Sequence, residues 1–232
     1  MKVSIIIPVY NEIKTIEIII NKVLKQTKFK KEIIVVDDGS TDGTQGIISK
    51  NLKNKIDFFL KHKINKGKGS AIHTGLKYVS GEIVLIQDAD LEYDPSDYQH
   101  LLKPIIEGKC SVVYGSRVLG KKRYNFNGFT SIFRVFANHV LTILSNMINS
   151  QNLTDAHTCY KVFKVEILKE IKLYEKGFNF CPELTTKLSN NNIKILEVPI
   201  NYIGREYNEG KKIKFKDGLD ALVTLIKYKI LK

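Results

Sequence analysis

The chain has 232 residues, 43% of them hydrophobic and 26% charged, a composition that is typical of a globular protein and argues against a disordered one. Its formal net charge of +13 indicates a negatively charged partner, such as nucleic acid, an anionic membrane surface or phosphorylated small molecules. The three cysteines have no C-x-x-C spacing, which argues against a disulfide framework or a zinc site and favours reduced thiols in a cytoplasm. No run reaches the roughly 20 apolar residues that a membrane span needs, and no signal peptide is predicted.

Apolar runs and helical patterns alternate along the first half of the chain. The runs predict strands at residues 2–11, 32–38, 56–62, 82–88 and 110–116. Between them, helices are predicted at residues 12–26, 44–54, 68–79 and 96–107. This alternation predicts βαβ crossovers and an α/β fold with a mainly parallel sheet. Ligands of such sheets collect at the carboxyl ends of the strands, where three polar clusters fall, at residues 8–12, 37–42 and 87–94.

The second half is less regular and contains two amphipathic segments. Residues 129–149 are predicted to form a helix whose polar residues follow one narrow line: Ser131, Arg134, Asn138, Thr142, Ser145 and Asn149. Residues 192–203 are predicted to form a strand. The last segment, 211–232, is a basic loop that runs into a helix with one apolar stripe: Leu219, Leu222, Val223, Ile226 and Ile230. Because the chain has no internal repeat or linker, a single domain is favoured.

The two amphipathic helices are typical of helices that lie in a membrane interface, because a wide apolar face is joined to basic surroundings. Each lysine near an anionic surface contributes on the order of 1 kcal/mol, so the lysines of the last segment favour reversible contact with an anionic membrane. The alternative is that both helices pack on the sheet. For residues 129–149 we expect the interface, because a buried helix would leave its polar line in need of partners.

An acidic turn follows the strand predicted at 82–88 directly. Because residues two apart in an extended segment point to the same side, Asp88 and Asp90 are expected to project together. Such a pair of hard oxygen ligands suits Mg²⁺ or Mn²⁺, which commonly take one or two carboxylates together with substrate phosphates. A divalent ion would also relieve the repulsion among the carboxylates of this turn. The alternative is a solvated acidic loop that caps the helix beginning near Ser96.

Seven motifs in order along the chain carry a resemblance to a known family. They are "SIIIPVYNE", "IIVVDDGSTDGT", "NKGKGSAIHTGLKY", "GEIVLIQDADLEYDP", "VVYGSR", "LTDAHTCYKVF" and "VPINYIGREYNEGKKIKFKDG". Together they resemble the family 2 glycosyltransferases, specifically the branch of dolichyl-phosphate mannose synthases and bacterial polyprenyl-phosphate glycosyltransferases. The resemblance implies a GT-A fold, a Rossmann-like and mainly parallel sheet flanked by helices, in one glycosyltransferase domain over residues 1–232. It further implies that residues 1–118 bind the nucleotide sugar and that residues 119–232 form the acceptor side.

The resemblance also implies roles for the residues of the donor half. Pro8, Tyr10 and Glu12 are expected to line the nucleotide pocket, and Asp37 and Asp38 to contact the base and the ribose. Carboxylates suit that contact because base N–H and ribose O–H groups are donors. The alternative is that these residues only end a strand and form a turn with a helix cap.

At the acidic turn, the resemblance implies that Asp88 and Asp90 are catalytic residues that hold Mg²⁺ or Mn²⁺ against the donor diphosphate. Asp88 is also expected to contact the donor itself. Glu92 is a third metal ligand, although many relatives carry glutamine there. Lys68, in "GKG", is expected to contact a donor phosphate, with a solvated lysine as the alternative.

The reaction that the resemblance implies is inverting transfer of a hexose, from a donor of the GDP-mannose or UDP-glucose type, to a polyprenyl or dolichyl phosphate. Such an acceptor is already an anion, so it needs positioning and not a general base. Arg117, in "GSR", matches the catalytic arginine that grips the acceptor phosphate, and a guanidinium can do so in bidentate fashion. Arg134 and Arg205 are the next candidates, with Lys211 and Lys212 behind them; the alternative for these four is a surface charge. Because no transmembrane helix is predicted in this sequence, we expect a peripheral protein at the cytoplasmic membrane face; the alternative is a soluble acceptor.

Three other functions are weighed against this one. A sugar-to-sugar transferase of polysaccharide synthesis would need a base to deprotonate a hydroxyl, and Glu183 in "CPE" is the candidate. A nucleic-acid-binding protein is disfavoured, because acidic residues stand at the strand ends and no recognition motif is present. A Rossmann oxidoreductase is disfavoured because no G-x-G-x-x-G follows the first strand.

Overall fold

The computed structural model describes residues 1–120, 129–205 and 215–231. Within these residues, seven strands form one sheet in the order β3-β2-β1-β4-β6-β5-β7. Their bounds are β1 Lys2–Val9, β2 Lys30–Asp37, β3 Phe58–Lys61, β4 Ile83–Ile86, β5 Val112–Ser116, β6 Lys161–Lys164 and β7 Leu196–Pro199. Only β6 is antiparallel to its neighbours, β4 and β5, so the prediction of a mainly parallel sheet is confirmed.

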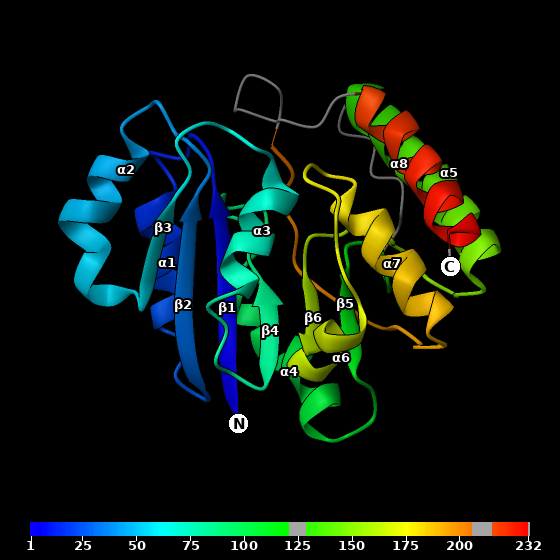
Figure 1. The fold of residues 1–232 in the computed structure, drawn as a ribbon, viewed down its shortest axis with the longest axis horizontal. Helices are drawn as coiled ribbons and strands as arrows, with labels where there is room; N and C mark the ends of the chain where they lie inside the picture. The colour runs from blue at the N-terminus through cyan, green and yellow to red at the C-terminus, as the bar shows by residue number, and fades with distance from the viewer. Residues whose placement is uncertain (121–128, 206–214, 232) are drawn as a thin grey trace.

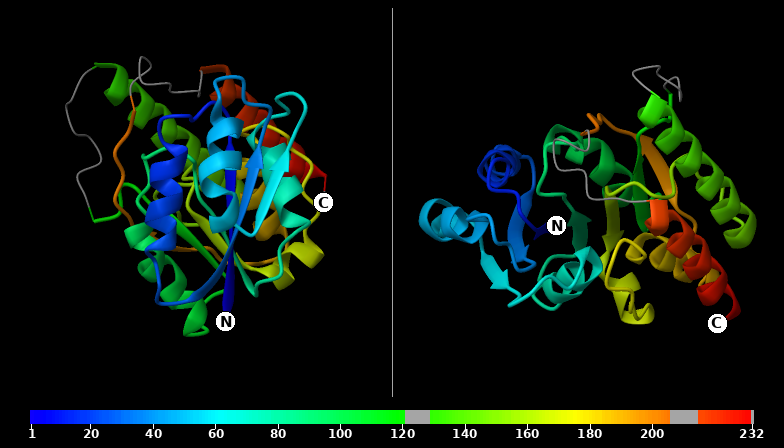
Figure 2. Two further views of the ribbon diagram at one scale, coloured as in Figure 1. Left: turned by 90° about the vertical axis from the view of Figure 1, so that its left-hand side faces the viewer. Right: turned by 90° about the horizontal axis from the view of Figure 1, so that it is seen from above.

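Helices cover both faces of this sheet (Figure 1). Helices α3 (Lys68–Leu76), α6 (Val165–Glu170) and α7 (Phe180–Asn190) lie on one face, and α1 (Ile16–Leu24) and α4 (Tyr98–Ile106) on the other (Figure 2). A short segment of mixed helix, α2 (Thr44–Ile47), η1 (Ile48–Leu52) and η2 (Lys53–Lys55), precedes β3, and the turn η3 (Pro95–Asp97) leads into α4. Because both faces are covered, β1 and β4 are buried along nearly their whole length, which is why they read as continuous apolar runs.

Two further helices, α5 (Phe129–Asn149) and α8 (Phe215–Ile230), pack against each other and against α7. Figure 1 shows them side by side at the end of the molecule opposite to α1 and α2. No helix in the described ranges has both the length and the apolar content that a membrane crossing requires.

The described part of the polar line of α5, from Asn138 to Asn149, faces inward, and the expectation that it would lack partners in a packed helix is wrong for these residues. Asn138 donates to the carboxylate of Asp155 over 3.1 Å, and Asn149 donates to the hydroxyl of Thr186 over 3.2 Å. The more C-terminal members of the line are almost completely buried: Thr142, Ser145 and Asn149. The partners come from α7 and from the loop before β6, elements that the sequence pattern had not predicted.

The outward side of α5 is apolar instead. Its exposed members recur at helical spacing and include Phe136, which is 54% exposed, and Met147, which is 74% exposed; the others are Val140 and Ile143. The predicted apolar stripe of α8 is exposed in the same way at Leu219, Val223, Ile226 and Ile230. Each helix therefore buries its more polar or mixed side and presents apolar side chains to the outside.

Candidate active site

The predicted site residues of the first half meet at one edge of the sheet. Parallel strands β1, β2, β4, β5 and β7 all end there, and the antiparallel β6 begins there. The segments that follow or precede these ends are residues 10–12, 37–38, 87–92, 116–117, 155–160 and 200–205. Strand direction thus brings together side chains that are up to 195 residues apart in sequence, which is the arrangement expected for a ligand site in such a sheet.

The acidic turn after β4 is wrapped around the guanidinium of Arg205. That group donates to both carboxylate oxygens of Glu12, each over 3.1 Å, and to Asp90 over 2.8 Å. The Nε atom of Arg205 lies 3.8 Å from Glu92, whose carboxylate also accepts from the backbone N–H of Arg205 over 2.8 Å. Three carboxylates from two segments therefore converge on one cation, so Asp90 and Glu92 do not belong to a merely solvated loop, whereas Asp94 of the same turn does cap the helix that follows by accepting from the backbone N–H of Ser96.

Asp88 turns to a different cation. Its carboxylate forms an ion pair with the ammonium of Lys68, at the start of α3, and the same ammonium lies 3.0 Å from the thiol sulfur of Cys159. Burial alone would lower the pKa of Lys68, but the neighbouring Asp88 carboxylate raises it well above its ordinary value. Lys68 is therefore a half-buried, charged partner of Asp88 and not a solvated lysine.

The environment of Asp90 disfavours the charged form of its carboxyl group. Burial raises its pKa to about 7, and the nearby carboxylates of Asp88 and Glu92 act in the same direction, while Arg205 opposes them. Within the part of the chain that the structure describes, the repulsion from Asp88 and Glu92 thus works against the charge on Asp90, and Arg205 works in its favour.

The chemistry of this turn fits a hard divalent cation, because only oxygen ligands surround the Arg205 guanidinium. Among the described residues, however, no three His, Cys, Asp or Glu side chains are gathered in a metal-binding arrangement. Asp88 is directed to Lys68, whereas Asp90 and Glu92 are directed to Arg205. Mg²⁺ commonly needs only one or two carboxylates plus phosphate oxygens, and this turn can supply them if its side chains exchange partners.

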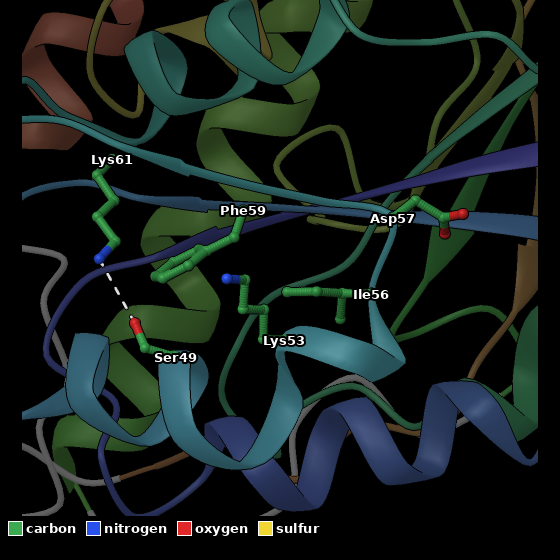
Figure 3. A pocket seen from close by; sticks show the side chains of 6 residues that line it. All are labelled: Ser49, Lys53, Ile56, Asp57, Phe59 and Lys61. Carbon is green, nitrogen blue, oxygen red and sulfur yellow. Dashed lines mark hydrogen bonds between the residues drawn. The ribbon is translucent and has the colours of Figure 1, made fainter.

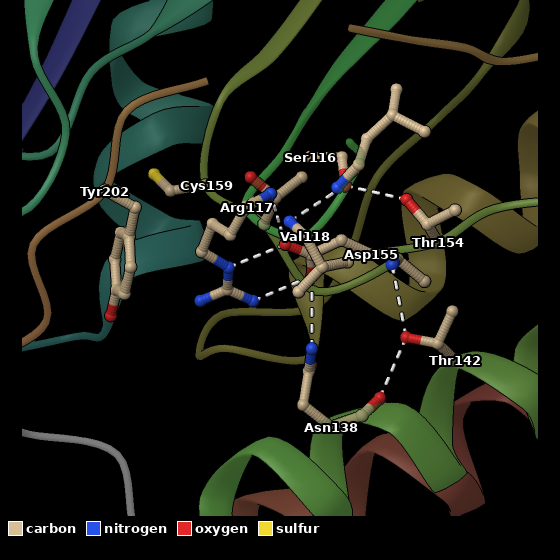
Figure 4. Close-up of polar contacts among 12 residues, drawn as sticks. Ser116, Arg117, Val118, Asn138, Thr142, Thr154, Asp155, Cys159 and Tyr202 are labelled. Carbon is tan, nitrogen blue, oxygen red and sulfur yellow. Dashed lines mark hydrogen bonds and ion pairs between the residues drawn. The ribbon is translucent and has the colours of Figure 1, made fainter. Parts of the chain in front are cut away.

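Arg117, directly after β5, is held by Asp155 (Figure 4). Its Nε and Nη2 atoms donate to the two oxygens of that carboxylate over 2.6 and 2.8 Å, and Asn138 of α5 donates to it as well. Burial would raise the pKa of Asp155, but Arg117 lowers it to about 2. The ring of Tyr202 lies 5.1 Å from the Arg117 guanidinium carbon, and its hydroxyl donates to Glu92 over 3.1 Å. Tyr202 therefore connects the acidic turn with the arginine.

The residues expected to hold the nucleotide lie at the ends of β1 and β2. Pro8 is buried within β1, and Tyr10 is half-buried just after it. One Asp37 oxygen accepts from the Ser40 backbone over 3.0 Å, while the other is buried without a hydrogen bond from any described residue. Asp38 is 2% exposed, and it accepts from His62 and from the backbone N–H groups of residues 66 and 67. In this structure Asp38 therefore fixes the loop before α3, a task that the sequence had not assigned to it.

Three predicted acceptor residues cannot be placed at the site, and the candidate base of the alternative reaction is engaged elsewhere. Arg134 belongs to α5, but its side chain is not among those described, and Lys211 and Lys212 fall in the range 206–214, outside the described residues. Glu183, the candidate base of a sugar-to-sugar transferase, is fully buried and accepts three hydrogen bonds, from Lys187 and from the backbone N–H groups of residues 174 and 175. This saturation argues against Glu183 as a proton acceptor.

A separate pocket of about 400 Å³ lies beside the edge strand β3 (Figure 3). It is lined by Ser49, Lys53, Ile56, Asp57, Phe59 and Lys61. None of these residues is a predicted site residue, so the candidate site is defined by the strand ends and not by this pocket.

Comparison with known proteins agrees with the resemblance. The sequence profile of glycosyl transferase family 2 matches residues 4–172. The chain belongs to this family. A UDP-N-acetylglucosamine–dolichyl-phosphate N-acetylglucosaminyltransferase of Methanococcus voltae is 29% identical over 98% of this chain and 96% of its own length. A dolichyl-phosphate beta-glucosyltransferase of Trichomonas vaginalis is 30% identical over 98% of this chain and 72% of its own length. The predicted branch of the family is thereby confirmed.

Solved structures confirm the GT-A fold of this family 2 protein. Glucosyl-3-phosphoglycerate synthase from Mycobacterium tuberculosis, in complex with Mg²⁺ and uridine diphosphate, superposes with a TM-score of 0.72 at 18% sequence identity. The match covers 98% of this chain and 79% of that one. The same enzyme with Mn²⁺, uridine diphosphate and glucosyl-3-phosphoglycerate gives a TM-score of 0.70 at 19% identity.

Proposed function

We propose that this protein is an inverting hexosyltransferase that moves a sugar from a nucleotide sugar to a polyprenyl or dolichyl phosphate. The observation that carries the proposal is the position of Arg117, which stands across Tyr202 from the acidic turn, 5.1 Å from the Tyr202 ring. A guanidinium near a metal-binding turn suits a reaction in which one phosphate group leaves and another attacks. The relatives named above use dolichyl phosphate by their names, which supports the same acceptor class here.

On the donor side, Pro8, Tyr10, Asp37 and Asp38 are proposed to hold the nucleotide, of the GDP-mannose or UDP-glucose type. Figure 1 supports this, since the ends of β1 and β2 lie next to each other. Glu12 lies at the same strand edge and contacts Arg205, so it joins the donor side to the acidic turn.

The diphosphate of the donor is proposed to bind at Asp88, Asp90 and Glu92 together with Mg²⁺ or Mn²⁺. When bound there, the metal ion supplies a Lewis acid against the charge that develops on the leaving diphosphate. Lys68 is already paired with Asp88, and its half-buried ammonium can add a further positive charge beside the leaving group.

On the acceptor side, Arg117 is proposed to position the lipid phosphate, with Arg134 and Arg205 as further candidates. Asp155 holds two of the N–H groups of Arg117, so the guanidinium is fixed in orientation. A phosphate monoester anion needs no base to become nucleophilic, and the saturation of Glu183 is consistent with a reaction that uses none.

The lipid acceptor is proposed to be reached from the surface of an anionic membrane. The outward apolar side chains of α5 and α8, two helices that pack together, would enter the interface: Phe136, Val140, Ile143, Met147, Leu219, Val223, Ile226 and Ile230. Because Asn138, on the opposite side of α5, contacts Asp155, this surface is one helix away from Arg117. The three cysteines are unpaired and all lie within the described residues, which supports the cytoplasmic side of that membrane.

The deciding experiment supplies the purified protein with Mg²⁺, a polyprenyl phosphate and a panel of radiolabelled nucleotide sugars. Label that passes into the organic phase identifies the donor and the acceptor class together. If label appears only when the acceptor is a soluble sugar, the lipid-phosphate proposal fails and sugar-to-sugar transfer takes its place.

A further inference from the structure

Arg205 was expected to bind an acceptor, yet its guanidinium is already surrounded by carboxylates of this protein. Its guanidinium lies among Glu12, Asp90 and Glu92, which are 6%, 9% and 6% exposed. The Arg205 side chain itself is 18% exposed. A cation therefore already occupies the position where the oxygen ligands of the turn converge.

We propose that Arg205 is the internal counter-cation of the acidic turn, and that a divalent metal ion binds to Asp90 and Glu92 only by displacing its side chain. This inference rests on the proposed function, because it takes the turn to be the metal site. Both oxygens of Asp90 are already engaged, one by Arg205 and one by the backbone N–H of Glu92, so a metal ion that entered between Asp90 and Glu92 would meet the guanidinium at contact distance, where two cations repel each other. Metal binding and the Arg205 contacts are therefore mutually exclusive.

Charge explains why the exchange is favourable once a metal is present. The three carboxylates carry three negative charges at full ionisation, and Arg205 brings one positive charge to them. A divalent ion offsets two and accepts oxygen ligands from several directions, whereas the planar guanidinium donates only in its own plane. The exchange thus relieves more of the repulsion that burial makes costly.

The backbone beside Arg205 indicates how far the side chain can move. The N–H of Arg205 donates to Glu92 over 2.8 Å, and the N–H of Ile203 donates to the backbone oxygen of Glu92 over 3.0 Å. Residues 202–205 are therefore tied to the acidic turn by their backbone, and displacement requires only a rotation of the side chain. A displaced guanidinium stays within one side-chain length of the turn, where phosphate oxygens are its natural partners.

Mn²⁺ binding to the protein without nucleotide tests the proposal, with free Mn²⁺ measured by electron paramagnetic resonance. When a competent state is populated only in part, the apparent affinity falls by that fraction, so Arg205→Gln should bind Mn²⁺ at least about tenfold more tightly than the unmodified protein. Arg205→Lys, which keeps a charge but cannot span Glu12 and Asp90, should lie between the two.

Lys22→Gln is the matched control. Lys22 forms an ion pair with Asp94, which belongs to the same acidic segment, over 2.7 Å. Its replacement therefore removes one positive charge from the neighbourhood of that segment, as the replacement of Arg205 does. Asp94 is not among the carboxylates around Arg205, and we expect the Mn²⁺ affinity to change by less than about threefold, as for a screened charge nearby. Equal gains in the two variants would reduce the effect to general electrostatics and overturn the displacement.

Thermal unfolding gives a second readout that does not depend on affinity measurements. Arg205→Gln should be less stable than the unmodified protein in EDTA, because three carboxylates then face one another, and saturating Mn²⁺ should raise its melting temperature by more. Equal Mn²⁺ affinity in both proteins overturns the proposal, even if transfer remains metal-dependent. If neither protein binds Mn²⁺, the proposal and the metal in the proposed function both fail, while the lipid-extraction assay still decides the transfer itself.

Discussion

The guanidinium of Arg117 is clamped by the carboxylate of Asp155, through two side-chain hydrogen bonds of 2.6 and 2.8 Å and a third, of 3.1 Å, from the Arg117 backbone N–H. Asp155 is completely buried, whereas the Arg117 side chain is 20% exposed. The pair thus anchors one side of the guanidinium and leaves the other side for a ligand. Asn138 completes the anchor from α5.

Arg117→Ala should slow transfer by about 100-fold or more, as for loss of a positioned charged donor, and leave nucleotide binding nearly unchanged. Lysine at this position should restore transfer only in part, because an ammonium cannot reproduce the bidentate contacts. Initial rates at varied acceptor concentration, beside nucleotide titrations by calorimetry, separate the two effects. A comparable loss of nucleotide affinity would move Arg117 to the donor side.

Asp155→Asn should act through Arg117. The variant leaves a partly buried guanidinium without its counter-charge, which costs about 3–5 kcal/mol of stability when a buried pair is broken. Transfer should fall mainly through a higher KM for the acceptor. Residues that act as a unit are not additive, so the double variant with Arg117→Ala should lose less than the sum of the single losses. Additive losses would show that Asp155 has a role apart from Arg117.

Asp90→Asn tests the acidic turn. We expect transfer to be abolished and the fold to be kept, because the substitution removes a charge that burial and Asp88 make costly. EDTA should abolish the transfer activity of the unmodified protein, and Mg²⁺ or Mn²⁺ should restore it. The measurement is label transfer beside circular dichroism; full activity in EDTA would eliminate the metal from the mechanism.

Glu183→Gln separates a structural role from a base. The carboxylate accepts from Tyr174 N–H over 2.7 Å, from Glu175 N–H over 2.8 Å and from Lys187 over 2.6 Å. An amide cannot accept at both positions, so we expect a loss of about 1–3 kcal/mol in the free energy of unfolding. The pH profile of kcat/KM should keep its shape at a temperature where the variant is folded. Loss of one limb of that profile without loss of stability would restore Glu183 as a base.

The prediction from sequence succeeded for the long apolar strands and failed for β6, a short strand in which a lysine is buried. β6 was missed because it is four residues long and begins and ends with lysine. Lys161 is nevertheless buried, where its ammonium donates to the Ala156 carbonyl and lies 3.6 Å from the centre of the Tyr114 ring. The contact with Tyr114 could not be predicted from the sequence pattern, because Tyr114 lies on the neighbouring strand β5.

The prediction of the site residues was limited in the same way, because contacts between distant segments could not be predicted. The acidic turn was predicted because its carboxylates are close together in sequence, and Arg117 because of a short motif. The partners of these residues were missed: Asp155 is 38 positions from Arg117, and Arg205 is 115 positions from Asp90. Only strand order brings them together. The motif "LTDAHTCYKVF" contained the available signal for Asp155, an acidic residue in an otherwise uncharged stretch before a lysine.

The stability of the opposite edge of the sheet should depend on pH through Glu32. This buried carboxylate accepts from the ammonium of Lys2 over 2.5 Å, from the hydroxyl of Ser4, and from Ser80. Burial would raise the pKa of Glu32, but these donors lower it from 4.5 to about 2. A depressed pKa in the folded state means that the stabilisation is complete above about pH 4.5 and is lost as the pH falls toward 2.

Glu32→Gln should therefore cost about 1.5–3 kcal/mol at pH 7, the range for hydrogen bonds to a charged group. The difference from the unmodified protein should shrink below pH 4, as measured by urea unfolding at several pH values. Glu166→Gln is the control, because that side chain is 68% exposed and its loss should stay within about 0.5 kcal/mol. A difference that stays constant down to pH 2.5 would contradict the assignment.

The apolar side of α5 provides the test of membrane contact. Phe136 and Ile143 are 54% and 46% exposed on that helix, while Ile106 and Ile18 are 52% and 46% exposed on α4 and α1, two helices that cover the sheet (Figure 2). The two pairs offer nearly equal apolar exposure at different places. Replacing a pair with serine therefore changes the hydrophobicity by a similar amount, and only the location differs.

In sedimentation with anionic liposomes, the double variant Phe136→Ser and Ile143→Ser should bind at least about tenfold more weakly, since each half-buried side chain contributes on the order of 1 kcal/mol. The control pair Ile18→Ser and Ile106→Ser should bind like the unmodified protein. Binding should need anionic lipid and weaken with salt, because exposed charges are screened. Equal losses in both pairs would mean non-specific adsorption. If the unmodified protein stays in the supernatant at low salt, the membrane proposal fails, and a water-soluble acceptor becomes the better proposal for the ligand of Arg117.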